Sequence, residues 1–194
     1  MQYSLHSSAS KLPAPAIFLD RDGTINVDKD YLYKVSDWEW IPGAQQSIQK
    51  LQNLGFKIIV VSNQSGIARG FYNITDVDNL HSFIHSDLEK SNIRIDGFFY
   101  CPHHPSYGAS CDCRKPSPFM LIKAKELLNL ELKSSWIIGD RVSDMECGIA
   151  AGVKPLFVKT GHGLNELSIL KGHIEVFESI KYATEYIINK SINQ

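Results

Sequence analysis

The segment AIFLDRDGT, residues 16–24, joins a short apolar run to two closely spaced acidic residues. The run over residues 16–20 is typical of a strand that is buried on both faces, as strands are in parallel sheets covered by helices. Gly23 follows the acids and allows the chain to turn sharply there. The segment therefore predicts a buried strand with Asp20 and Asp22 at its carboxyl end.

Four more apolar runs follow, at residues 56–62, 97–101, 135–140 and 155–159. Helical spacing of apolar residues, or a helix start signal, lies between successive runs. This alternation predicts an α/β fold, a Rossmann-like parallel sheet with helices on both faces. The expected helices are residues 44–54 and three that begin at the pairs Thr75 and Asp78, Ser117 and Pro118, and Ser143 and Glu146.

The domain organisation is predicted to be simple. Residues 1–15 are polar and contain two prolines near their end, so we expect a flexible leader. Residues 16–194 contain neither a linker nor an internal repeat, and we expect one domain over that range. Its last part, residues 164–194, is expected to add one or two helices.

Composition excludes several classes of protein. The 20 basic and 21 acidic residues leave a net charge of −1, which argues against an electrostatic nucleic-acid binder. No apolar run approaches the ~20 residues that span a bilayer, and residues 1–15 lack the apolar core of a signal peptide. Four cysteines are too few for a disulfide scaffold. We expect a cytoplasmic monomer that binds neither nucleic acid nor membrane.

Asp20 and Asp22 have a spacing suited to phosphoryl transfer. Carboxylates two residues apart on an extended chain point the same way. Asp20 could attack phosphorus, while Asp22 could protonate the leaving oxygen and later deprotonate water. Alternatively, the acids and Gly23 only mark a turn after a strand. A calcium loop is disfavoured, because no regularly spaced acids follow.

A second acidic segment, GDRVSD at residues 139–144, ends another predicted strand. Ligands of open α/β sheets bind at the carboxyl ends of the strands, where Asp20 and Asp140 would meet. Mg²⁺ prefers oxygen ligands and could lie between these two carboxylates. Asp144 has an equally plausible role as an acid in the first turn of a helix.

Two polar positions at other predicted strand ends could hold a phosphoryl group. Ser62 begins the segment SNQSGIARG, and its hydroxyl and nearby N–H groups could bind phosphate oxygens. Lys115, in the segment CDCRKP, offers a positive charge. Each signal is weak alone, since a single lysine is usually a solvated surface residue.

Together, these segments resemble the haloacid dehalogenase superfamily of aspartate-nucleophile phosphatases. The matching elements are DRDGT at residues 20–24, Ser62-Asn63, Lys115 and GDRVSD at residues 139–144. The resemblance implies that Asp20 is the nucleophile, that Asp22 is the acid–base catalyst, and that Ser62 and Lys115 hold the phosphoryl group. It also implies Mg²⁺ bound by Asp20, the backbone carbonyl of Asp22, and Asp140.

Within that superfamily, the motifs FLDRDGTIN, SNQSGIARG, CPHHP and CDCRKP resemble the heptose 1,7-bisphosphate phosphatases over residues 16–162. That resemblance implies removal of the C7 phosphate in the biosynthesis of ADP- or GDP-heptose. The histidinol-phosphate phosphatases share three of these elements and are the alternative. A polynucleotide 3′-phosphatase is disfavoured by the lack of a kinase P-loop. A non-catalytic phosphosugar-binding module should lack one of Asp20, Asp22, Lys115 or Asp140, and all four are present.

Three cysteines and a histidine lie within thirteen residues, with the spacing C-x-H-x₇-C-x-C. Three thiolates and an imidazole suit a closed, structural Zn²⁺ site. The expected ligands are Cys101, His103, Cys111 and Cys113, with His104 as the alternative to His103. A disulfide or free thiols are the other interpretations. A zinc site here would hold Arg114 and Lys115 near the phosphate.

The predicted pocket is open, because residues 24–61 leave no room for a folded cap domain once the expected helix and strand are placed. Asp28, Lys29, Asp30 and Tyr31 could face sugar hydroxyls. Arg69, Arg114 and Arg141 could bind a second phosphate in a bidentate manner. The complete set of predicted substrate contacts is Arg21, Asp28, Asp30, Tyr31, Ser62, Asn63, Gln64, Ser65, Arg69, Arg114, Lys115 and Arg141.

Overall fold

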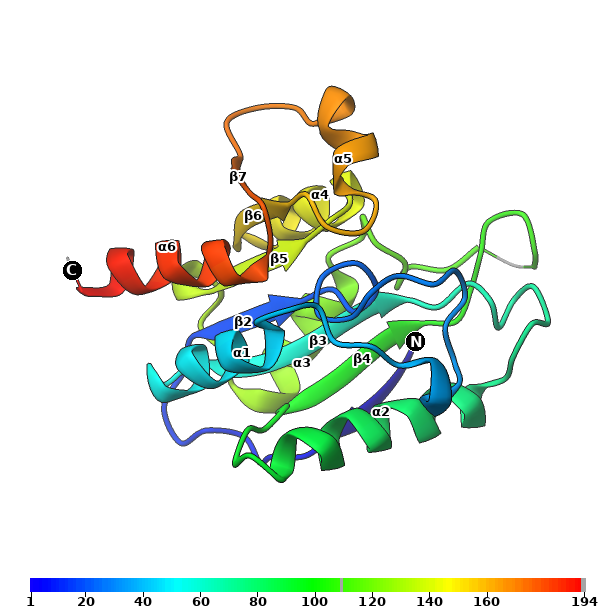
Figure 1. The fold of residues 1–194 in the computed structure, drawn as a ribbon, viewed down its shortest axis with the longest axis horizontal. Helices are drawn as coiled ribbons and strands as arrows, with labels where there is room; N and C mark the ends of the chain where they lie inside the picture. The colour runs from blue at the N-terminus through cyan, green and yellow to red at the C-terminus, as the bar shows by residue number, and fades with distance from the viewer. Residues whose placement is uncertain (109, 193–194) are drawn as a thin grey trace.

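A computed structural model describes residues 1–108 and 110–192, and within them a seven-stranded sheet forms the centre of the molecule (Figure 1). The strand order is β1-β4-β3-β2-β5-β6-β7, and β1 alone of the described strands runs antiparallel to its neighbour. The strands are β1 (Gln2–Leu5), β2 (Ala16–Leu19), β3 (Lys57–Asn63), β4 (Gly97–Cys101), β5 (Trp136–Gly139), β6 (Lys154–Val158) and β7 (Glu175–Phe177). The prediction of a helix-covered α/β sheet is thus confirmed.

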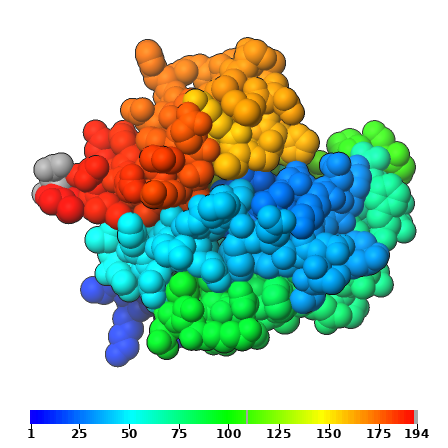
Figure 2. Space-filling view, viewed as in Figure 1, coloured from blue at the N-terminus to red at the C-terminus, as the bar shows by residue number. Residues whose placement is uncertain are grey.

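Helices cover both faces of this sheet. They are α1 (Ala44–Asn53), α2 (Ile74–Glu89), α3 (Phe119–Leu128), α4 (Val142–Ala151), α5 (Gly163–Glu166) and α6 (Ile180–Ile192), with short 3₁₀ turns η1 (Val35–Asp37), η2 (Leu132–Ser134) and η3 (Leu167–Ile169). Apolar residues of α1, α2 and α6 pack on one face, and those of α3 and α4 pack on the other. In the space-filling view, the red C-terminal segment lies against the cyan segment that contains α1 (Figure 2).

The central strand β2 shows why this sequence forms a two-faced sheet. All four of its side chains are buried. Ile17 and Leu19 belong to the core beneath α1, α2 and α6, whereas Ala16 and Phe18 belong to the core beneath α3 and α4. Successive side chains of a strand point to opposite faces, so a continuous apolar run supplies both cores at once.

The expectation of a flexible leader over residues 1–15 is wrong. Residues 2–5 pair with β4 as an antiparallel edge strand, and Tyr3 stacks on Phe99 with ring centroids 5.5 Å apart. The backbone N–H of Ala14 donates to the carbonyl of Asn129 at 3.1 Å. Without β1, the strand β4 would expose a row of unpaired backbone groups, and pairing satisfies them. Residues 2–5 are therefore part of the sheet, and Ala14 is held to the segment after α3.

The expected start signals of α2 and α4 lie two residues too late. Asn73 caps α2: its side chain accepts from the N–H of Asp76 at 3.1 Å, and Asp76 accepts from the N–H of Asn73 at 2.8 Å. In α4, Asp144 accepts from the N–H of Arg141 at 3.1 Å. For α3, Pro118 rather than Ser117 is the N-cap residue. Several polar pairs near each helix start have the spacing of a capping box, and the backbone conformation determines which pair caps the helix.

The region between β2 and β3 holds η1 and α1, and no separate domain forms there in the described chain. Residues 164–192 add α6 as expected and also the short strand β7, which pairs with β6. None of the helices within residues 1–108 and 110–192 has the length and apolar character needed to cross a membrane.

Candidate active site

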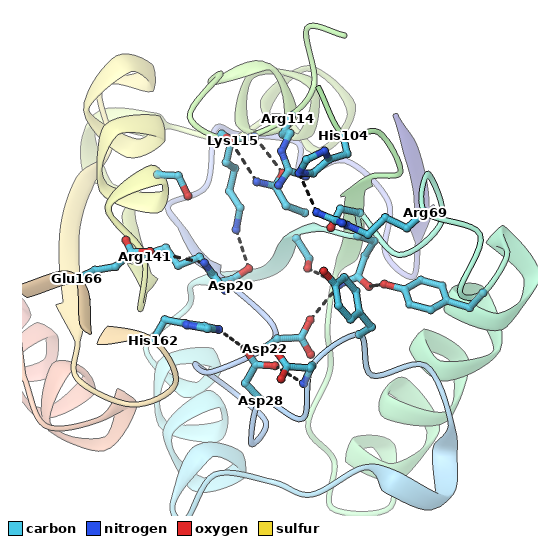
Figure 3. A pocket seen from close by; sticks show the side chains of 18 residues that line it. Asp20, Asp22, Asp28, Arg69, His104, Arg114, Lys115, Arg141, His162 and Glu166 are labelled. Carbon is cyan, nitrogen blue, oxygen red and sulfur yellow. Dashed lines mark hydrogen bonds and ion pairs between the residues drawn. The ribbon is translucent and has the colours of Figure 1, made fainter. Parts of the chain in front are cut away.

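The loops at the carboxyl ends of the parallel strands enclose a pocket of about 500 Å³ (Figure 3). Of the residues predicted to act in catalysis or to face substrate, all but Arg21 and Lys29 line it: Asp20, Asp22, Asp28, Asp30, Tyr31, Ser62, Asn63, Gln64, Ser65, Arg69, Arg114, Lys115 and Arg141. Five further lining residues were not predicted: Tyr72, His104, Ser143, His162 and Glu166. The convergence follows from the parallel pairing of β2 with β3 and β5, which brings their ends to one edge.

A buried lysine lies at the floor of the pocket between two carboxylates. The Nζ of Lys115 lies 2.6 Å from an oxygen of Asp20 and 2.6 Å from an oxygen of Asp144. It also donates to the carbonyl of Val61 at 2.8 Å. Lys115 is only 4% exposed, so it is not a solvated surface residue. Asp144, whose role the sequence left open, is thus an ion-pair partner inside the site as well as a first-turn acid of α4.

The site holds more negative charge than Lys115 alone balances. Carboxylate oxygens of Asp20, Asp140 and Asp144 lie within 4.8 Å of one another, and all three residues are buried. Burial raises the pKa of Asp20 to about 6, although the Lys115 ammonium opposes this shift. Burial, followed by the charge of Asp20, raises the pKa of Asp140 to about 9. A divalent cation between these carboxylates would offset the repulsion.

Asp140 also has an oxygen available for such a cation. Its Oδ1 is buried and has no hydrogen-bond partner among the described residues. Its Oδ2 accepts from the N–H of His162 at 2.7 Å. Buried polar atoms are normally satisfied, so an orphaned carboxylate oxygen beside Asp20 marks a place for a ligand. The donor set, carboxylate oxygens, fits Mg²⁺.

Two glycines pack against Asp140 and make room for it. Gly23 and Gly161 have φ values of +83° and +58°, in the left-handed region. A Cβ added to either residue would collide with Oδ2 of Asp140. Glycine is therefore required at both positions for the loops after β2 and β6 to meet around this carboxylate.

Arg21 does not line the pocket, and the expectation that it contacts substrate is not supported by its position. It is fully buried, and its guanidinium donates to both carboxylate oxygens of Asp22, with a shortest distance of 2.8 Å. Its Nη2 also donates to the carbonyl of Leu32 at 2.9 Å. These hydrogen bonds hold the Arg21 side chain behind Asp22 rather than in the pocket.

At the rim of the pocket, Arg69 contacts residues of two neighbouring loops. Its guanidinium donates to the hydroxyl of Tyr107 at 3.1 Å and lies 3.2 Å from Nε2 of His104. The same group stacks over the rings of Tyr107 and Tyr31, at 4.5 Å and 5.6 Å from their centroids. Arg69 thus lies between the loops after β2 and β4, on the loop after β3.

On the opposite wall, the segment after β6 contributes His162 and Glu166, which the sequence analysis missed. Nε2 of His162 pairs with Asp28 at 3.0 Å, and Glu166 pairs with Arg141 at 3.5 Å. Glu166 also accepts from the N–H of Val142 at 2.6 Å. The available signal was positional: these residues directly follow a parallel strand, where ligands of such sheets bind.

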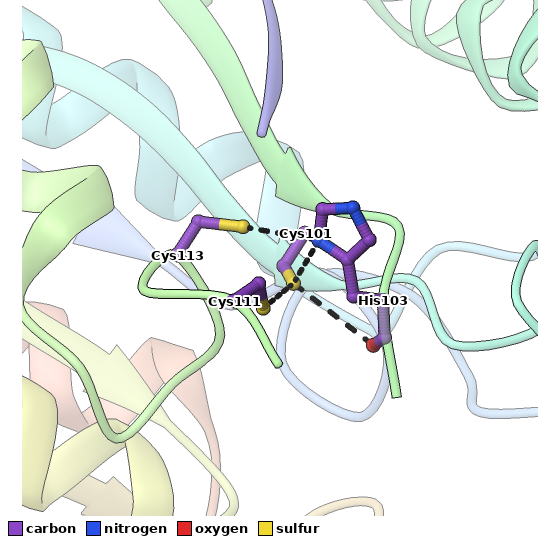
Figure 4. Close-up of side chains that lie close together, drawn as sticks. All are labelled: Cys101, His103, Cys111 and Cys113. Atoms are coloured by element: carbon purple, nitrogen blue, oxygen red, sulfur yellow. Dashed lines mark hydrogen bonds between the residues drawn. The ribbon is translucent and has the colours of Figure 1, made fainter. Parts of the chain in front are cut away.

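The structure assembles the predicted cysteine–histidine cluster (Figure 4), next in the chain to the pocket residues His104 and Arg114. The Sγ of Cys101 lies 3.5 Å from the Sγ of Cys111 and 3.8 Å from Nδ1 of His103, and the Sγ of Cys113 lies 3.6 Å from that nitrogen. His104 instead faces Arg69. The geometry therefore selects His103 over His104 as the fourth member.

This cluster fits a tetrahedral metal site. Four atoms bonded at about 2.3 Å to one Zn²⁺ ion lie about 3.8 Å apart, close to the distances observed among the sulfur and nitrogen atoms. The cluster also holds a residue of the pocket, because Arg114 donates to the carbonyl of His103 at 3.1 Å.

Comparison with known proteins agrees with this geometry. A family model of HAD-hydrolase-like proteins matches residues 112–181. The chain is 41% identical over 153 residues to the D-glycero-beta-D-manno-heptose-1,7-bisphosphate 7-phosphatase of Escherichia coli strain K12, over 76% of this chain and 80% of that protein. It is 40% identical over 158 residues to the protein of that name from Photorhabdus laumondii, over 78% and 84% of the two chains.

A solved structure is similar over nearly the whole fold. The crystal structure of D,D-heptose 1,7-bisphosphate phosphatase from B. bronchiseptica, complexed with magnesium and phosphate, matches with a TM-score of 0.83 and 32% identity. The match covers 91% of this chain and 99% of that one.

Proposed function

Because this chain belongs to the heptose 1,7-bisphosphate phosphatase family of the haloacid dehalogenase superfamily, we propose that it hydrolyses the C7 phosphate of D-glycero-D-manno-heptose 1,7-bisphosphate. The observation that carries the proposal is the buried group of Asp20, Lys115 and Asp140, of which Asp20 and Lys115 line the pocket and Asp140 lies beside Asp20. The reaction would serve the biosynthesis of nucleotide-activated heptose. Thiolates that stay reduced for metal binding agree with a cytoplasmic location.

The proposed reaction has two steps. In the first, a carboxylate oxygen of Asp20 attacks phosphorus, the bond from phosphorus to the sugar oxygen breaks, and Asp22 gives its proton to that oxygen. In the second, Asp22 takes a proton from water, whose oxygen attacks phosphorus and releases Asp20 and inorganic phosphate. Lys115 and Ser62 hold the phosphoryl oxygens throughout and stabilise the negative charge that develops on them.

Magnesium is the cation that we propose for the acidic site. Asp20, Asp140 and the backbone carbonyl of Asp22 would hold it. When bound, it would act as a Lewis acid and reduce the repulsion between the nucleophile and the anionic phosphate.

The walls of the pocket carry groups suited to both ends of a sugar bisphosphate. Asp30 and Tyr31 are partly exposed at the rim, where they could face sugar hydroxyls. Arg69, Arg114 and Arg141 line the same pocket and could bind the second phosphate, since guanidinium groups bind phosphate in a bidentate manner.

Substrate preference tests the proposal directly. Phosphate release should be measured with both anomers of the heptose bisphosphate, histidinol phosphate and a 3′-phosphorylated oligonucleotide. We expect kcat/KM to be at least about tenfold higher for a heptose bisphosphate, because charge-assisted hydrogen bonds to a second phosphate contribute roughly 1.5–3 kcal/mol each. A preference for histidinol phosphate would replace the proposed substrate with the alternative.

Structural zinc is proposed for Cys101, His103, Cys111 and Cys113. Cys111→Ala should lose about one equivalent of zinc and raise KM for the bisphosphate more than it lowers kcat, because Arg114 is held through the carbonyl of His103. Zinc content by mass spectrometry and steady-state kinetics check this result. Cys147→Ala is the matched control, since Cys147 donates to the carbonyl of Ser117 and lies outside the cluster. Full activity and stability of Cys111→Ala without zinc would contradict the proposal.

A further inference from the structure

Gln64 follows β3 and is buried, with 2% exposure, although it lines the pocket. Its backbone N–H donates to the carbonyl of Cys101 at 2.8 Å, which attaches this residue to the end of β4. The side-chain amide makes four hydrogen bonds. Nε2 donates to Asp22 at 3.0 Å and to Ser62 at 2.7 Å, and Oε1 accepts from Arg21 at 3.1 Å and from Tyr72 at 2.8 Å.

The partners of this amide determine its orientation. A guanidinium has donors only, so the atom of Gln64 that faces Arg21 must be the oxygen. The NH₂ group then faces Asp22, whose carboxyl oxygen Oδ2 accepts from it. Reversing the amide would place donors against Arg21 and an oxygen against the carboxylate. The donors of Arg21 and Tyr72 and the acceptor of Asp22 therefore hold Gln64 in one orientation.

This orientation also determines what Ser62 can do. Its hydroxyl oxygen accepts one hydrogen atom from Gln64. A hydroxyl that accepts there keeps its own hydrogen atom free to donate in another direction. Ser62 lines the pocket, so this hydrogen is available to a phosphoryl oxygen.

At Asp22, Gln64 acts together with two other donors. Arg21 donates to both carboxylate oxygens, and Asn26 donates to Oδ1 at 3.0 Å. Gln64 donates to Oδ2, on the side of Ser62. The same NH₂ group thus binds the carboxylate that moves the proton and the hydroxyl that holds the phosphoryl group.

We propose that Gln64 is a positioning residue that sets the acid–base carboxylate of Asp22 relative to Ser62 without contacting the substrate. The proposal rests on the proposed function, because it takes the roles of Asp22 and Ser62 from there. It differs from the sequence-based expectation that Gln64 binds substrate. A substrate contact would need a free donor or acceptor, and neighbouring residues occupy all four positions of the amide.

Substrates with different leaving groups distinguish a role in positioning Asp22 from a general loss of structure or substrate binding. A sugar oxygen needs a proton from Asp22 to leave, whereas p-nitrophenolate leaves without one. Gln64→Glu keeps the size of the side chain and the oxygen that faces Arg21 and Tyr72, but removes both donors. We expect kcat for the sugar bisphosphate to fall by about 100-fold, the lower end of the range for general acid–base catalysis. Release of p-nitrophenol in a single turnover, with enzyme in excess, should fall far less, because it loses only the Gln64 contact to Ser62 and needs no proton from Asp22.

Steady-state turnover of p-nitrophenyl phosphate should also fall, because the second step needs Asp22 as a base. The control is Gln46→Glu, the same substitution at an exposed position of α1, which should change neither substrate. Tyr72→Phe removes the hydrogen bond from Tyr72 to the amide oxygen of Gln64. Its rates on the two substrates should change in the same directions as those of Gln64→Glu, but by less. This variant tests the proposal if Gln64→Glu does not fold. Circular dichroism and zinc content show that each variant is folded.

Two results would overturn the proposal. One is a wild-type rate for Gln64→Glu on the sugar bisphosphate. The other is an equal loss in the single turnover of p-nitrophenyl phosphate, which would indicate a substrate-binding or structural role. A wild-type enzyme without activity on heptose bisphosphate would contradict the proposed function instead. The comparison of single-turnover with steady-state rates on p-nitrophenyl phosphate uses no heptose, so it still tests the role of Gln64: only the steady-state rate should fall strongly.

Discussion

Asp20→Asn should abolish phosphate release and leave the fold intact. An amide oxygen is a poor nucleophile, so the first step cannot proceed, and we expect kcat to fall by more than about 10⁴-fold, as when nucleophiles of other covalent enzymes are removed. Stability should not fall with it. Three buried carboxylates share the site with Lys115, and the loss of one negative charge reduces their repulsion.

Thermal unfolding separates these effects. In the presence of a chelator, the Tm of Asp20→Asn should equal or exceed that of the wild type. Added Mg²⁺ should raise the Tm of the wild type more than the Tm of Asp20→Asn, because the variant has lost one ligand and binds the ion more weakly. Asp37→Asn, the same substitution in the exposed turn η1, is the control variant. It should retain wild-type activity and Tm, and a mock preparation without the protein, made in the same way, shows the background from contaminating phosphatase. Retained turnover by Asp20→Asn above that background would reject Asp20 as the nucleophile.

Lys115→Met should cause the largest loss of stability. Methionine fills similar space without charge, and it leaves Asp20 and Asp144 buried without their cation. Removing one partner of a buried ion pair costs about 3–5 kcal/mol. For a chain of this size, that corresponds to a decrease in Tm of roughly 10 °C. Activity should fall as well, because Lys115 is the buried cation on the phosphoryl site.

The stability deficit of Lys115→Met should depend on pH. The ammonium of Lys115 opposes the rise in the pKa of Asp20, so its removal raises that pKa further above about 6. A carboxyl group with a raised pKa in the folded state binds protons more readily there than in the unfolded state. The deficit should therefore be smaller at pH 5 and grow as the pH rises to 8. Denaturant titrations at several pH values check this, with Lys125→Met, exposed on α3, as the control. A deficit that is constant with pH would contradict it.

The local pattern of the sequence was enough to predict the five central strands of the sheet and most of the residues that line the pocket. Continuous apolar runs, together with helical spacing or helix start signals between them, predicted the five strands β2 to β6 and the helices between them. Parallel strands must end at one edge, so Asp20, Ser62 and Asp140 were expected to meet there, and their loops do line or border one pocket. Closely spaced cysteines likewise predicted a cluster that the structure assembles.

Contacts between distant segments could not be predicted in this way. The pairing of residues 2–5 with β4 depends on an edge strand formed almost a hundred residues later. The pairing of His162 with Asp28 depends on two loops that meet only after the sheet has formed. Nothing in the local pattern of either partner indicates the other.

The sequence by itself determined which chemical groups stand at the ends of which strands, because residue type and periodicity are local properties. Only the tertiary structure decided what each group faces. Arg21 lies behind Asp22 rather than in the pocket, Lys115 is buried between two carboxylates, and the amide of Gln64 has one permitted orientation. These outcomes depend on packing and on the pairing of donors with acceptors, and both exist only once the chain has folded.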